Sequence, residues 1–176
     1  MESNAGVNRQ DMLDALPHLR RFAISLSGNQ ADGDDLLQTT VERVLKKGAP
    51  KDVDIRKWMF RICKNIWIDE IRSRQVRTRA VESQDITIHD RPESEQEIMD
   101  KLKLAQVKTA MKKLPDEQRA VLSLVAIEGY SYKDTAEILD TPIGTVMSRL
   151  ARARKNLAGQ FSEGAGPFTP AQAYRA

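Results

Sequence analysis

The stretch that decides the fold covers residues 131–157 and reads SYKDTAEILDTPIGTVMSRLARARKNL. Ser131 followed by Asp134 is a variant of the capping box, in which both side chains can satisfy free backbone N–H groups at a helix start. Pro142 stands where a second helix would begin, a position that tolerates its missing N–H. The spacing therefore predicts two helices, over residues 131–139 and 141–157, joined by a very short turn.

Two helices so connected have the layout of a helix-turn-helix, whose second helix reads duplex DNA. Ala136 offers a small side chain where the helices would cross, and apolar residues can fill the space between them: Ile138, Leu139, Val146 and Leu150. The second helix contains no acid. Its polar side chains can meet phosphates and base edges: Ser148, Arg149, Arg152, Arg154 and Lys155. A solvated basic face on an ordinary helical hairpin is the alternative.

Helical spacing of apolar residues extends over the rest of the chain. Residues 98–114 and 116–128 are candidate helices that end at Pro115 and Gly129. One stripe in the first half comprises Leu13, Leu16, Leu19, Phe22, Ala23 and Leu26. The helix expected over residues 34–47 has a stripe of Leu37, Val41, Val44 and Leu45. The helix expected over residues 55–76 is anchored by Trp58, Met59, Ile62, Ile66 and Ile71. No stretch alternates like a strand, so the predicted fold class is all-α.

Charge divides the chain more clearly than composition does. The 176 residues carry a net charge of only +3. Residues 55–79, however, hold eight basic residues against two acidic ones, an excess of +6, and residues 80–100 hold seven acidic residues against one basic one, an excess of −6. An acidic, apolar-poor segment of this kind is typical of a solvated linker. We therefore expect two small helical domains joined by a flexible acidic linker, and a disordered tail.

The basic block of the first half also contains aromatic residues. Trp58 lies among Arg61, Lys64 and Asn65. Aromatic faces that stack bases, beside cations that hold the backbone, are what single-stranded nucleic-acid binding requires. The alternative is that the tryptophans at helical spacing belong to the core. Arg61 and Asn65, four residues apart on one helix face, are harder to explain by packing.

Other kinds of chemistry find little support. A single cysteine, Cys63, excludes an internal disulfide, and we expect it to be packed and inert. His18 and His89 are too few for a zinc site. We find no catalytic machinery or cofactor motif, so we expect no enzyme activity. Without a signal-peptide core or a stretch long enough to span a bilayer, the expected location is the cytoplasm.

Several ordered motifs together resemble bacterial extracytoplasmic-function sigma factors of the sigma-70 family. In the second half these are LPDEQR at 114–119, GYSY at 129–132 and PIGTVMSRLARAR at 142–154, which resemble sigma domain four. In the first half, DDLLQ at 34–38 and WMFRICKN at 58–65 resemble sigma domain two. The resemblance divides the chain into domain two at 10–79, a linker at 80–97, domain four at 98–160 and a tail at 161–176.

This resemblance implies a role in transcription initiation without catalysis of its own. Domain four would read the minus-thirty-five element as duplex through a recognition helix that begins at Thr145 and ends at Lys155. Domain two would capture the single-stranded minus-ten element with Trp58, Arg61, Lys64 and Asn65. A polar helix face would dock on core RNA polymerase, and its residues are Asp35, Gln38 and Glu42. An anti-sigma factor is the implied regulator.

Two other functions fit parts of the pattern. A helix-turn-helix regulator could bind DNA through residues 114–157 and use the first half for sensing or dimerisation. A helical adaptor could use its charged blocks for protein contacts alone. Initiation by core polymerase at a promoter distinguishes a sigma factor from both.

Overall fold

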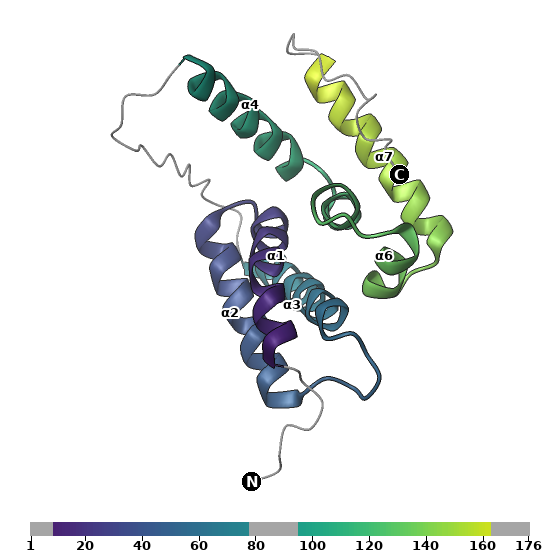
Figure 1. Cartoon of the computed structure of the whole chain (residues 1–176). Coiled ribbons are helices and arrows are strands. Elements are labelled where there is room, and N and C mark those ends of the chain that lie inside the picture. The colour runs from purple at the N-terminus through teal and green to yellow at the C-terminus, as the bar shows by residue number, and fades with distance from the viewer. Residues whose placement is uncertain (1–8, 78–94, 163–176) are drawn as a thin grey trace.

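The computed structural model describes residues 9–77 and 95–162, and the regular elements within them are all helical (Figure 1). In chain order they are α1 (Arg9–Ser27), α2 (Gln30–Lys47), α3 (Ile55–Arg77), α4 (Glu95–Lys112), α5 (Asp116–Leu122), the π-helical turn η1 (Ser123–Ile127), α6 (Tyr132–Leu139) and α7 (Ile143–Ser162). The all-α prediction is confirmed. Residues 80–94 of the predicted linker and 163–176 of the predicted tail lie outside the described residues.

The first three helices pack as a bundle, in which a tight corner joins α1 to α2 (Figure 1). Gly28 leaves α1 with a φ of +82°, a conformation that glycine adopts at no steric cost. Asn29 then caps α2, because its side-chain oxygen accepts a hydrogen bond of 2.8 Å from the N–H of Asp32. This cap starts α2 at Gln30, four residues before the predicted start at Asp34.

The buried stripe of α2 is shifted by about one residue toward the N-terminus from the predicted stripe. Leu36, Thr40 and Val44 are buried, whereas Leu45 is exposed and Leu37 is only partly buried. Thr40 can lie in the core because its hydroxyl donates a 2.7 Å hydrogen bond to the carbonyl of Leu36. A pattern built on apolar residues alone misses such a threonine.

A similar shift occurs in α1. Leu13 is exposed, and Met12 and Ala15 are buried in its place. The other five predicted members of the α1 stripe are buried or partly buried: Leu16, Leu19, Phe22, Ala23 and Leu26.

The predicted helix-turn-helix is present in the second half. The Ser131 hydroxyl accepts a 3.0 Å hydrogen bond from the Asp134 N–H, which confirms Ser131 as the predicted N-cap, and it donates one of 2.6 Å to the Asp134 carboxylate. Asp140, with a left-handed φ of +51°, closes α6. The residues expected between the two helices are buried: Ile138, Leu139, Val146 and Leu150.

The single helix predicted over residues 116–128 is wrong in its second half. The chain widens there into η1, where the Glu128 N–H reaches back five residues to the carbonyl of Ser123 at 3.0 Å. Ser123 is fully buried, and its hydroxyl lies 2.8 Å from the hydroxyl of Ser25 on α1. The wider turn thus places a polar side chain against the first half of the protein.

The two halves share one core, although the sequence suggested two small ones. Phe22 of α1 contacts Phe60 of α3 with ring centroids 5.1 Å apart, and Phe60 contacts Tyr130 at 5.4 Å in an edge-to-face arrangement. Tyr130 belongs to the loop before α6. This aromatic row crosses the boundary between the halves, which we call the seam: the contacts of α1 and α3 with residues 112–141.

Two charged side chains are buried in the seam. Arg119 is 7% exposed and donates to the carbonyls of Leu26, Lys112 (3.1 Å) and Leu114 (2.9 Å). The side chain of Glu128 is 1% exposed. Arg21 donates two hydrogen bonds to it, of 3.0 and 3.1 Å, and the His18 Nδ1 atom lies 2.8 Å from it. Since an unpaired buried charge is strongly unfavourable, these partners hold the halves in one arrangement.

The α1–α2 crossing leads to a prediction at Gly33. A Cβ atom there would lie 2.5 Å from Cγ1 and 2.7 Å from Cα of Ile24. Helix propensity favours alanine over glycine by about 1 kcal/mol, but we expect the clash with the α1 backbone to dominate. Gly33→Ala should therefore lower the free energy of unfolding by about 1–3 kcal/mol, measured by urea denaturation.

Gly159→Ala on α7 is the matched control. No atom lies within 4 Å of a Cβ atom at that position, so this variant should gain up to about 1 kcal/mol. Stabilisation by both substitutions would contradict the close crossing.

Candidate functional site

One face of α7 carries most of the predicted duplex-binding residues. Ser148, Arg152 and Lys155 are exposed, and Thr145 and Arg149 are half-buried. Their spacings of three and four place them on one side of the helix. The opposite side packs inward, because Val146, Leu150 and Ala153 are fully buried. The structure therefore gathers five of the six predicted residues on one polar face.

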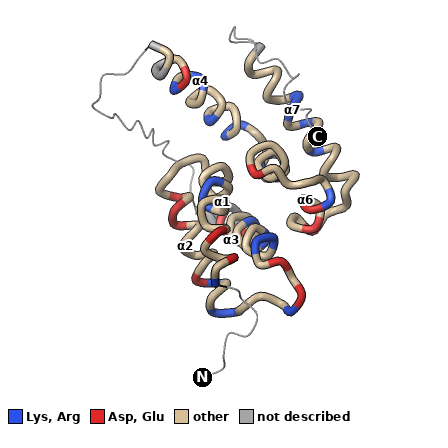
Figure 2. Tube along the Cα trace, in the orientation of Figure 1, with Lys and Arg blue, Asp and Glu red and all other residues tan. Residues whose placement is uncertain are grey.

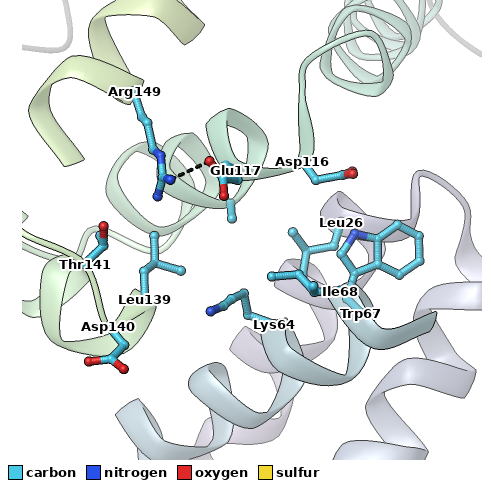
Figure 3. Close-up of a pocket in the computed structure, with 11 residues that line it drawn as sticks. Leu26, Lys64, Trp67, Ile68, Asp116, Glu117, Leu139, Asp140, Thr141 and Arg149 are labelled. Atoms are coloured by element: carbon cyan, nitrogen blue, oxygen red, sulfur yellow. Dashed lines mark ion pairs between the residues drawn. The ribbon is translucent and has the colours of Figure 1, made fainter. Parts of the chain in front are cut away.

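Arg154 does not belong to that face. It follows Arg152 by two residues, or about 200° around the helix, and it is half-buried. Arg149 is on the face but already has a partner, since its guanidinium forms an ion pair with Glu117 of α5 (Figure 3). Arg152 is thus the exposed arginine of the group, and Arg149 is held in place by α5.

The predicted single-strand residues lie along one side of α3. Asn65 is exposed, while Trp58, Arg61 and Lys64 are half-buried. Trp58 packs against the edge of the core, whereas Phe60 and Trp67, on the inner side, are buried. Arg61 is only partly open to solvent, because its guanidinium contacts the end of α6 across the seam.

A pocket of about 230 Å³ opens at the seam and joins the two predicted DNA-binding faces. Lys64 of α3 and Arg149 of α7 both line it, together with Asp116, Glu117 and Asp140, and of these three acids Glu117 points toward Arg149 (Figure 3). Burial lowers the pKa of Lys64 from its usual value, because desolvation disfavours the charged form. The fold thus brings predicted contacts of both halves to one cavity.

The predicted polymerase-docking residues lie on the outer side of α2. Asp35, Gln38 and Glu42 are all exposed. The Gln38 amide donates a 3.1 Å hydrogen bond to the Glu42 carboxylate. Figure 2 shows acidic positions along α2 and mostly basic positions along α4 and α7, so this side of α2 differs in charge from the helices of the second half.

Cys63 is fully buried on the inner side of α3. Burial raises the pKa of its thiol to about 12, so the reactive thiolate is scarce at neutral pH. This burial confirms the prediction of a packed cysteine.

Sequence reasoning missed Lys57, which shares its side of α3 with Arg61 and Lys64. The Lys57 ammonium lies 2.5 Å from Asp134 and 2.7 Å from Glu137, both on α6. These carboxylates raise the pKa of Lys57, and the Lys57 ammonium in turn lowers the pKa of Asp134. The spacing of four and then three residues between the three cations was the signal that could have identified it.

Comparison with known families matches both halves of the chain. Residues 12–64 match the family described as the Sigma2 domain of PhyR, and residues 104–157 match Sigma-70, region 4. The chain is 37% identical over 171 residues to the ECF RNA polymerase sigma factor EcfG of Rhodopseudomonas palustris, with 96% of this chain and 93% of that protein covered. The chain belongs to the ECF RNA polymerase sigma factors.

Solved structures resemble this sigma factor over nearly its whole length. The sigma factor RpoE of Bartonella quintana, solved in complex with the anti-sigma factor NepR, superimposes with a TM-score of 0.70 at 29% identity, covering 89% of this chain and 98% of that one. CnrH, solved in complex with the cytosolic domain of CnrY, gives a TM-score of 0.65 at 25% identity, covering 92% and 94%.

Family membership makes this sigma factor a transcription protein and not an enzyme, as the sequence predicted. Among the described helices, none combines the length and the apolar run that crossing a bilayer needs. The roles of the individual residues on α2, α3 and α7 remain predictions.

Proposed function

We propose that this sigma factor binds core RNA polymerase through the outer side of α2 and engages both promoter elements. The recognition helix α7 reads the minus-thirty-five element as duplex, and α3 captures the single-stranded minus-ten element. The working division is domain two at 10–79, a linker at 80–97, domain four at 98–160 and a tail at 161–176. The observation that carries the proposal is the match of region-two and region-four families to the two halves of one chain.

The geometry of α7 supports duplex reading. Ser148, Arg152 and Lys155 project from the side opposite the buried stripe, as required of a helix that enters the major groove. Arginine can hydrogen-bond guanine through two atoms and can also hold phosphate. The Arg149–Glu117 pair fixes one arginine against α5 and presents its neighbours outward.

The side chains of α3 support strand capture. Cations can hold the backbone of an unstacked strand, and the exposed amide of Asn65 can meet a base edge. Trp58 stands one helical turn before Arg61 and offers part of its ring at the same face. The buried Phe60 and Trp67 hold this helix in the core.

An anti-sigma factor is the regulator that we propose. The support is the fold likeness to RpoE, which was solved bound to the anti-sigma factor NepR. Its surface on this chain would include the polymerase-docking face of α2.

The polymerase assignment predicts the behaviour of Gln38→Ala. Purified wild-type protein added to core polymerase should start RNA synthesis at a cognate promoter. Gln38→Ala should need about three- to tenfold more protein for half-maximal synthesis, since it loses a polar contact worth about 1 kcal/mol. Its affinity for minus-thirty-five duplex should be unchanged. Normal initiation with weakened duplex binding would refute the docking face.

The α7 assignment predicts the salt dependence of Arg152→Ala. Losing one phosphate contact should weaken binding to the duplex and reduce the slope of log K against log salt by about 0.9. Fluorescence anisotropy over a salt series measures both. Lys108→Ala removes an exposed cation of α4 and serves as the control, with no expected change in slope. Equal behaviour of the two variants would mean that α7 does not read the duplex.

A further inference from the structure

Helix α6 lies against the cationic side of α3 across the seam, and the contact is mostly ionic. Lys57 of α3 bridges two carboxylates one turn apart on α6, at 2.5 Å from Asp134 and 2.7 Å from Glu137. Asp134 has a local role in the capping box, whereas the Glu137 side chain is 50% exposed and pairs with Lys57 of α3. Glu137 therefore adds an acidic contact with α3 that the stability of α6 itself does not require.

Arg61 contacts the end of the same helix. Its guanidinium donates to the backbone carbonyls of Glu137 and Ile138, the latter at 3.4 Å, and lies 3.7 Å from the Asp140 carboxylate. Carbonyls in the last turn of a helix lack intrahelical partners and carry the negative end of its dipole. The left-handed conformation of Asp140 ends the helix at this point, so the end of α6 faces the arginine.

The acceptors of α6 form a row of negative groups that matches the row of cations on α3. Lys57 meets two carboxylates, Arg61 meets the carbonyls and a third carboxylate, and Lys64 lines the same pocket as Asp140. A nucleic-acid backbone likewise presents regularly spaced oxygen acceptors to the lysines and arginines of a protein that binds it.

We infer that α6 acts as an intramolecular mimic of a nucleic-acid backbone, which covers the strand-binding side of α3 until the seam opens. The inference rests on the proposed function of α3, because the covered cations Arg61 and Lys64 are among those assigned to the minus-ten strand. The inference adds that α6 and the DNA strand compete, because the same cations cannot hold both at once. The closed arrangement of the two halves is then a state of low affinity for single-stranded DNA.

The strength of these contacts suits a reversible cover. Partly exposed ion pairs each change an equilibrium by a factor of about two to five. Removing the carboxylates of Glu137 and Asp140, whose side chains do not cap α6, should therefore raise the population of the open form, and with it the strand affinity, by about tenfold.

The test uses the full chain with the double substitution Glu137→Gln and Asp140→Asn. Both side chains are exposed, 50% and 86% respectively, and asparagine tolerates the left-handed backbone at position 140. Asp11→Asn with Asp100→Asn is the control, since it changes the net charge equally and lies away from α6. The probe is a fluorescent 12-nucleotide single-stranded DNA of random sequence, followed by anisotropy.

Opening is measured independently by energy transfer between dyes on cysteines introduced at Lys46 of α2 and Lys108 of α4, both exposed. Cys63, buried and with its thiol pKa raised, stays unlabelled. We call the double substitution Glu137→Gln and Asp140→Asn the seam variant. We expect it to lower the energy transfer between the dyes and to bind single-stranded DNA about tenfold more tightly than the wild type. The control variant should change neither by more than about twofold, and excess unlabelled DNA should lower the transfer of the wild type.

Two outcomes separate failure of the inference from failure of the proposed function. If Asn65→Ala weakens strand binding but the seam variant changes neither affinity nor transfer, α3 binds the strand and the cover by α6 is wrong. If the seam variant lowers transfer while strand affinity responds neither to it nor to Asn65→Ala, the strand-binding assignment of α3 is wrong, and the competition is overturned with it.

Discussion

The arrangement of the protein depends on one buried guanidinium. Arg119 can lie in the seam only because its N–H groups reach the carbonyls of Leu26, Lys112 and Leu114, which lie at or just beyond the C-terminal ends of α1 and α4. Asp116 lies 3.4 Å away and offsets part of the charge. Arginine stays protonated even when burial lowers its pKa. A charge that cannot be neutralised needs its partners while it is buried, so Arg119 fixes how the two halves sit in the closed arrangement.

This constraint explains how the two DNA-facing helices come to face a common pocket. Arg119 of α5 donates to the carbonyl of Leu26 at the end of α1. On this side of the seam, Glu117 of α5 forms an ion pair with Arg149 of α7. On the other side α3 presents Lys64 to the same cavity. Glu128, paired with Arg21, closes the seam at its other edge. The cations that promoter DNA would need are thus partly engaged by the protein's own acidic groups.

Local signals in the sequence predicted the helices well, and the seam poorly. The capping box at Ser131 and the proline at 142 depend on neighbours in the chain, and the structure agrees with both. Thr40 is buried because its own backbone satisfies its hydroxyl, which an apolar pattern does not register. Arg119 and Glu128 look like ordinary surface charges in the sequence. Their partners on α1, Leu26 and Arg21, lie about a hundred residues away, so only the folded structure identifies their role.

The seam should make the two halves one cooperative unit, which calorimetry of the full chain can measure. Two-state unfolding requires equal calorimetric and van't Hoff enthalpies. The seam predicts a single transition with a ratio of the two enthalpies near one. Two separate transitions, or a calorimetric enthalpy about twice the van't Hoff value, would show that the halves unfold independently and would contradict the claim.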